Sequence, residues 1–105
     1  GRTFTSNGDG TDHGWGAHHF VLGGAVRGGD LYGRFPELGA KNPNNNNFDS
    51  SPDQLGNGSL LPSTSVDQLG ATLARWMGLS DGQLLDVFPN LGRFDPAQRD
   101  LGFMA

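Results

Sequence analysis

The chain has 105 residues, a formal net charge of −4 and no cysteine. This length allows a single domain at most, and 18 glycines with only 34% hydrophobic residues leave little material for an apolar core. The basic residues are scattered, which argues against nucleic acid as a partner, and no apolar run approaches the roughly 20 residues of a membrane span. We also find no signal-peptide pattern.

Near the N-terminus, oxygen-bearing side chains alternate with glycine from Ser6 to Asp12. The spacing resembles a calcium-binding loop, but a helix-loop-helix calcium site needs a glutamate where this sequence has histidines. We therefore interpret the segment as a Gly/Asn/Asp turn. The alternative is an oxygen-ligand loop, which would imply a calcium-dependent adhesion or interaction module.

All three histidines of the chain and one carboxylate fall within eight positions, as Asp12, His13, His18 and His19. Imidazole and carboxylate are ligands that divalent cations take in a protein without thiolates. The two glycines between His13 and His18 allow a tight turn, so that the imidazoles can converge on one ion or on two neighbouring ions. The cluster predicts a metal site, with a surface cluster of uncharged histidines as the alternative. Zinc fits these ligands best, and calcium, magnesium and manganese are further candidates.

Two short extended segments are predicted after the histidines. The apolar run Phe20–Val26 is bounded by glycines, which is typical of a buried strand. The segment Leu31–Pro36 is a second extended piece that its proline closes. Residues 39–58 are rich in Asn, Gly, Pro and Ser and include four consecutive asparagines, which predicts a long mobile loop.

A first helix is predicted from Ser65 to Met77. Ser65 and Gln68 form a capping box, and Gly78 supplies a C-terminal stop. The apolar side chains of the helix recur at helical spacing: Val66, Leu69, Leu73 and Trp76 or Met77. We therefore expect an amphipathic helix.

A second, shorter helix is predicted from Asp81 to Phe88. Ser80 and Gln83 repeat the capping pattern, and Pro89 ends the helix. We expect large side chains of both helices to serve as core or docking residues: Trp76, Leu84, Leu85 and Phe88. The tail that follows has no clear periodicity and is expected to wrap over a surface.

Three stretches together resemble the C-terminal part of a sulfatase-like bacterial family, a domain of unknown function in the alkaline phosphatase superfamily. They are Gly1–Thr3, Asn7–Gly29 and Thr64–Trp76, and residues 87–91 are similar to the family's closing motif. The resemblance implies a large α/β sheet with a two-metal site. It also implies an exported or periplasmic location, although no export signal is present here.

The resemblance assigns ligand roles within the histidine cluster. Asp12 and His13 match an Asp-His ligand pair, and His18 or His19 matches a third ligand. The remaining ligands and a Ser or Thr nucleophile come from N-terminal segments in the superfamily, which this chain does not contain. Residues 1–105 are therefore expected to be a single, incomplete domain.

Three protein ligands with an open position can hold a metal-bound water whose pKa falls to about 7. Such a water can attack an ester, lactone or phosphoester without a protein nucleophile, and the resemblance implies a phosphate or sulfate ester as the substrate. Asp9 or the unused histidine is the candidate general base, and Arg27 is the candidate to orient a small anionic substrate. The predicted function is a metal-dependent hydrolase of ester bonds.

The alternative is a non-catalytic metal-binding fragment that self-associates into a homo-oligomer through exposed sheet edges. The predicted fold is α+β or α/β, with a small partial sheet and one or two C-terminal helices. Within the single domain, we expect the metal-ligand loop and short strands in 1–38, the mobile loop in 39–58 and a helical part in 59–105.

Overall fold

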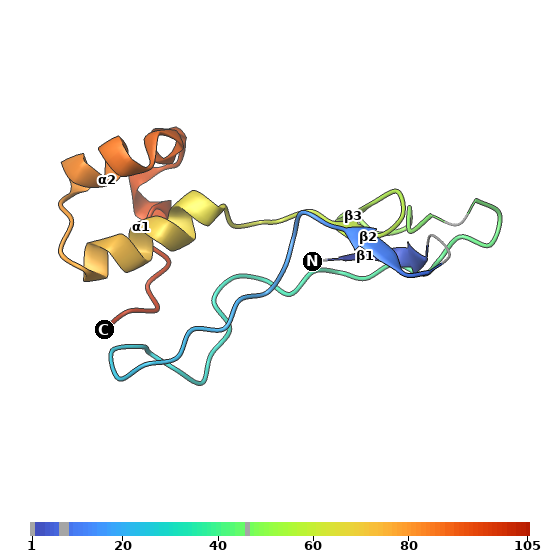
Figure 1. The fold of residues 1–105 in the computed structure, drawn as a ribbon, viewed down its shortest axis with the longest axis horizontal. Helices are drawn as coiled ribbons and strands as arrows, with labels where there is room; N and C mark the ends of the chain where they lie inside the picture. The colour runs from blue at the N-terminus through green and yellow to red at the C-terminus, as the bar shows by residue number, and fades with distance from the viewer. Residues whose placement is uncertain (1, 7–8, 46) are drawn as a thin grey trace. The chain divides into compact units, whose positions relative to one another are not determined.

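The computed structural model of the protein describes residues 2–6, 9–45 and 47–105 (Figure 1). The chain divides into two compact units that alternate in the sequence: unit 1 is Gly1–Phe20 and Arg34–Ser63, and unit 2 is Val21–Gly33 and Thr64–Ala105. Unit 1 contains two short antiparallel sheets and unit 2 contains two α-helices. The protein is therefore a small α+β protein, and this part of the predicted fold class is confirmed.

Unit 1 is built from two hairpins. In the first, β1 (Arg2–Ser6) pairs with β2 (Thr11–His13) with an irregular register. In the second, β3 (Gln54–Leu55) pairs with β4 (Ser59–Leu60). The backbone N–H groups of Phe4 and Thr5 both donate to the carbonyl of Asn57, at 2.9 and 3.1 Å. The turn of the second hairpin is thereby tied to the first.

The interior of unit 1 is polar. Its buried side chains carry hydroxyl, carboxylate or amide groups: Thr3, Thr5, Ser51, Asp53, Gln54 and Ser59. Among the described residues, the fully buried hydrophobic side chains all lie in unit 2. Unit 1 therefore depends on hydrogen bonds more than on apolar burial, as expected from the glycine-rich composition of the chain.

The strand predicted for Phe20–Val26 is wrong. Phe20 and Leu22 are 93% and 92% exposed, and residues 23–25 form a bend and turn. Only Val26 makes a bridge, with Met104. Among the described residues no strand runs beside this apolar run, so it has no partner with which to form a sheet.

Two other expectations for the middle of the chain need correction. The segment Leu31–Pro36 forms no strand. Residues 39–58, predicted to be a loop throughout, include β3 and the turn that leads to β4. The predicted loop contains the four consecutive asparagines, of which Asn46 lies outside the described residues.

Both predicted helices of unit 2 are confirmed. Helix α1 is Val66–Trp76 and helix α2 is Asp81–Val87, and each begins with the capping box expected from the sequence, at Ser65 and at Ser80. Two 3₁₀ helices follow, η1 (Pro89–Arg93) and η2 (Pro96–Gln98). None of the described helices is long and apolar enough to cross a membrane.

The core of unit 2 forms between α1, α2 and η1. Ala71, Leu84 and Leu91 are each 1% exposed and pack together, with partly buried apolar side chains around them. Leu84 is thus a core residue as predicted, and Phe88 packs at the edge of this core. Trp76, however, is 54% exposed, so it is not a core residue, and the docking role that was the other expectation stays a prediction.

Besides Ala71 in the core, helix α1 buries two polar side chains within its own unit. The buried Gln68 donates to the carbonyl of Gln98 at 2.6 Å, and the Oγ1 of the buried Thr72 accepts from the N–H of Leu101 at 2.9 Å. Arg75, one turn further along, pairs with Asp100. The tail therefore lies against α1, as expected, but it is held by polar groups. Large apolar side chains of the helix and its C-cap stay exposed: Val66, Trp76 and Met77.

Candidate functional site

The segment Asp12–His19, called the histidine segment below, begins on β2. Asp12 and His13 are consecutive in this strand and both are exposed. The backbone N–H of Asp12 donates to the Oγ1 of Thr3 at 3.0 Å, and Arg2 lies opposite His13 in the strand pairing. Strand β1 thus fixes the start of the histidine segment.

The middle of the histidine segment packs against β4. Gly16 is buried, and a Cβ atom on it would lie 2.8 Å from the carbonyl oxygen of Leu60 and 3.1 Å from the Leu60 Cβ. A larger residue does not fit without a shift of the backbone. The neighbouring Trp15 is 69% exposed, so the backbone makes this contact while the indole stays in solvent.

The two histidines at the end of the segment have different surroundings. The His18 ring stacks on Phe35, with 4.9 Å between ring centroids and 15° between ring planes. His19 is exposed and follows directly in the chain. The stack limits the orientations open to His18, and the described residues provide no matching ring for His19.

Phe35 is itself held in place by its neighbour Arg34. The guanidinium of Arg34 makes a bidentate pair with Asp53, from Nη1 to Oδ2 at 2.7 Å and from Nη2 to Oδ1 at 2.5 Å. The backbone N–H of Glu37 also donates to Asp53 Oδ2, at 2.6 Å. Hydrogen bonds from Arg34, and then from the Glu37 backbone, lower the pKa of Asp53 to about 2.

Two further side chains hold the segment 34–39. The N–H of Gly39 donates to Oε1 of Gln54 at 2.6 Å, and the hydroxyl of Ser51 donates to the carbonyl of Glu37. Side chains of residues 51–54 therefore bond the backbone of residues 37–39, where a paired strand would use its own N–H and C=O groups.

The predicted ligands do not form a preformed site. Within the described residues, no three His, Asp or Glu side chains come together as a group able to hold a metal ion. Asp12 and His13 are adjacent on β2, where successive side chains point to opposite faces, and His18 is stacked on Phe35. The metal site therefore stays a prediction.

The two candidate catalytic residues lie in different units. Asp9 is exposed in unit 1, while Asn7 and Gly8 of the possible calcium loop lie outside the described residues. Arg27 belongs to unit 2, where its Nη1 donates to the carbonyl of Gly102 at 3.4 Å and its backbone N–H to that of Phe103 at 2.8 Å. Their roles as base and substrate-orienting group stay predictions.

Sequence reasoning missed the residues that support the histidine segment. Phe35, Arg34 and Asp53 carry no local pattern that links them to His18, and Leu60 lies far from Gly16 in the chain. Arg34 has two later aspartates within twenty residues, Asp49 and Asp53, and nothing in the sequence indicates which of them it pairs with. The close approach of Gly16 to β4 has no counterpart in the local sequence.

These observations describe a small α+β protein whose three histidines are exposed on one segment of unit 1. Residues 1–88 match the family described as "Protein of unknown function (DUF1501)", and the chain belongs to that family. The matched range includes the whole histidine segment and both α-helices. Comparison with curated proteins and with solved structures gave no match.

Proposed function

We propose that this protein supplies metal ligands to a metal-dependent hydrolase that cleaves ester bonds, with Asp12, His13 and either His18 or His19 as ligands. One observation carries the proposal: the histidine segment is fixed at β2 and at Gly16, while its three imidazoles are exposed. Histidines that serve only the core are buried, whereas exposed imidazoles on a fixed backbone are accessible to a cation.

The described side chains alone do not make a three-ligand group, so the proposed site needs further ligands or a local rearrangement on binding. We therefore assign no reaction step to a bound ion. Zinc fits the imidazoles best, with calcium, magnesium and manganese as alternatives. Asp9 is the proposed general base and Arg27 the proposed contact for a small anionic substrate.

The resemblance to a sulfatase-like family of the alkaline phosphatase superfamily supports the substrate class. It favours a phosphate or sulfate ester, and a carboxyl ester or lactone is the alternative. The same resemblance supports an exported or periplasmic protein and a fold related to the C-terminal part of an alkaline-phosphatase-like domain. Each of these statements belongs to the proposal.

A second candidate function is non-catalytic metal binding with self-association through sheet edges. It does not require the described side chains to form a catalytic site by themselves. This alternative keeps the same ligands but predicts no turnover. It also predicts that chelation changes the oligomeric state, which size-exclusion chromatography measures.

Metal binding is the first test. Calorimetric titration of the metal-free protein with zinc, calcium, magnesium and manganese is expected to show binding that His13→Ala and Asp12→Asn weaken about tenfold or more, because each removes one ligand. Asp86→Asn, which removes an exposed carboxylate of α2, is the matched control and should bind as the unchanged protein does. Equal binding by all variants would refute both candidate functions.

Hydrolysis distinguishes the two functions. A panel of phosphate, sulfate and carboxyl esters and lactones should reveal activity that a chelator removes, added metal restores and His13→Ala abolishes. Metal binding without turnover on any ester would favour the structural role. Calcium selectivity with no effect of histidine loss would instead support a calcium-loop module.

A further inference from the structure

Helix α1 and its C-cap carry an apolar stripe along a side that their own unit leaves largely open. We call this stripe the α1 seam, and its members recur at helical spacing: Val66, Leu69, Leu73, Trp76 and Met77. Val66, Trp76 and Met77 are 77%, 54% and 74% exposed, and the two leucines are partly buried. None of these side chains belongs to the core of unit 2, all of whose residues the structure describes.

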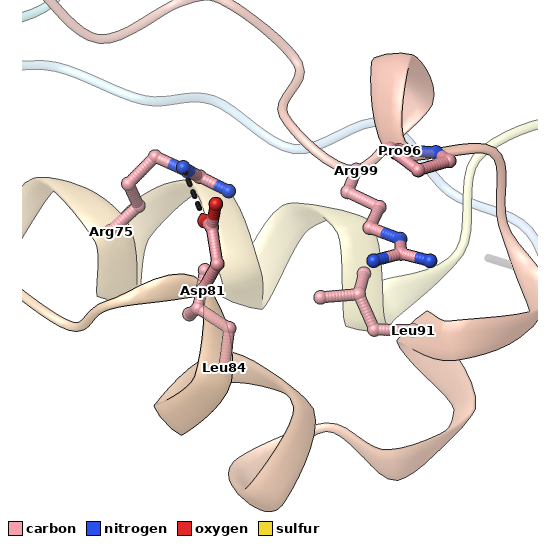
Figure 2. A pocket seen from close by; sticks show the side chains of 6 residues that line it. All are labelled: Arg75, Asp81, Leu84, Leu91, Pro96 and Arg99. Atoms are coloured by element: carbon pink, nitrogen blue, oxygen red, sulfur yellow. Dashed lines mark ion pairs between the residues drawn. The ribbon is translucent and has the colours of Figure 1, made fainter.

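The other side of α1 is occupied by its own unit. Ala71 packs in the core, and the side chains of Gln68 and Thr72 bond the tail. Nη1 of Arg75 lies 2.6 Å from Asp81 Oδ1 at the start of α2, and Figure 2 shows this ion pair at a small pocket lined from α1, α2 and the tail. These contacts fix the rotation of the helix, so the exposed part of the α1 seam has no partner inside unit 2.

The spacing of the seam is that of a coiled-coil contact. Intervals of three, four and three residues place Val66 and Leu73 at the a positions of a heptad, and Leu69 and Trp76 at its d positions. The flanking e and g positions carry no charge: Ser65, Gly70, Thr72 and Met77. Two copies of the seam can therefore meet without repulsion between like charges.

An antiparallel arrangement fits two copies of α1. Around a two-fold axis at Ala71, Val66 of one copy lies level with Trp76 of the other, so the smallest side chain of the seam packs against the largest. Leu69 lies level with Leu73 in the same way. Each helix N-terminus is then beside the C-terminus of the other helix, where the partial charges attract, whereas parallel helices would bring two acidic first turns together.

The exposed surface of the seam is sufficient for a weak, reversible dimer. At the exposures given above, the seam leaves roughly 500 Å² on each copy, so a symmetric pair buries roughly 1,000 Å², the lower limit for a specific interface. A membrane surface fits less well. Interfacial helices carry several Lys or Arg on the polar face, whereas Arg75 is the single basic residue of α1 and the chain has a net charge of −4.

We propose that two copies of this chain associate through the α1 seam as a symmetric antiparallel dimer, with a dissociation constant on the order of 100 µM. The contact lies in unit 2, apart from the histidine segment and from the sheet edges of unit 1. It depends neither on metal binding nor on ester hydrolysis.

Sedimentation velocity of the whole chain tests the association. In the presence of a chelator, the protein should change reversibly from monomer to dimer between about 1 µM and about 1 mM. Met77→Lys should weaken the association about tenfold or more, because it places an unpaired charge in the seam. Val87→Lys, which changes a 56% exposed valine of α2 outside the seam, is the matched control and should dimerise as the unchanged protein does.

A spin label tests the orientation of the two helices. Because the chain has no cysteine, Ser63→Cys takes a single label, at an exposed position two residues before the N-cap of α1. Mixed with isotope-labelled unchanged protein, the label should broaden the NMR signal of the Met77 methyl group more than those of the Val66 methyl groups. The reverse order would refute the antiparallel arrangement.

Several outcomes would overturn the dimer itself. These are a monomer over the whole concentration range, equal association of Met77→Lys and Val87→Lys, or association that occurs only without the chelator. Binding of the monomer to anionic lipid vesicles through the seam would assign it to a membrane instead. If Met77→Lys does not fold, Trp76→Ala takes its place, since loss of the large ring should also weaken association about tenfold.

Discussion

The carboxylate of Asp53 receives both terminal nitrogens of Arg34, and through this pair the neighbouring Phe35 is placed against the ring of His18. The side chain of Asp53 is only 11% exposed, while that of Arg34 is 62% exposed. Asp53 is therefore the buried partner of the ion pair, and Arg34 extends to it from the surface. A structural ion pair in unit 1 thus supports one end of the histidine segment.

Acid is expected to loosen unit 1 only below about pH 4. Because the folded pKa of Asp53 is lowered from 3.8 to about 2, its stabilising contribution is complete above the unfolded pKa and is lost as the pH falls through the folded value. Asp53→Asn should lower the free energy of unfolding at pH 7. It should also make the free energy of unfolding depend less on pH between about pH 4 and 2. Urea unfolding followed through NMR signals of unit 1 measures both effects, with Asp86→Asn as control. An acid dependence that is unchanged in Asp53→Asn would show that another carboxylate controls it.

The stack on Phe35 predicts distinct NMR signals for the two adjacent histidines. The ring current of Phe35 should shift the His18 ring protons upfield relative to those of His19, because the rings are nearly parallel at 4.9 Å. Phe35→Leu should remove this shift and leave His19 unchanged. If both histidines kept their shifts in Phe35→Leu, the stack would not exist in solution.

Local patterns predicted the helices of unit 2 well. The capping boxes at Ser65 and Ser80 involve residues three positions apart, so the sequence contains the whole interaction. The strand predicted for Phe20–Val26 failed for a related reason. The apolar composition of this run favours a strand, but a strand also needs a neighbour to pair with, and the local sequence does not show whether one is present.

The sequence identifies the residues of the histidine segment as candidate ligands, a role that stays a prediction, but it does not give the geometry of the segment. The residue types are sufficient to propose a metal, whereas the contact of Gly16 with Leu60 and the pair of Arg34 with Asp53 join residues far apart in the chain. Such contacts arise only when the two hairpins have formed. The sequence therefore predicts the chemistry of the segment and leaves its supports unpredicted.

Gly16→Ala is expected to displace the histidine segment from β4. The added Cβ would meet the Leu60 carbonyl at 2.8 Å, and relief of this clash requires a backbone shift that costs about 1–3 kcal/mol in unit 1. Gly10→Ala, whose Cβ would meet its nearest neighbour at 3.9 Å, is the control in the same unit and should change little. Urea unfolding gives the cost, and amide shifts of His13 and His18 report the displacement. Identical amide spectra for both variants would contradict the close contact.

The orientation of α1 can be tested by comparing an exposed apolar residue with a buried one. Met77, at the C-cap, is 74% exposed, so Met77→Gln should change the free energy of unfolding by no more than about 0.5 kcal/mol. Leu84→Ala removes a side chain that is 1% exposed and should cost about 2–5 kcal/mol. The third variant, Thr72→Val, keeps the shape but removes the hydroxyl that accepts from Leu101, which should cost about 1–3 kcal/mol. Denaturant unfolding of unit 2 measures all three. If Met77→Gln were as costly as Leu84→Ala, the C-terminal end of α1 would be buried, contrary to the exposure of Met77 described above.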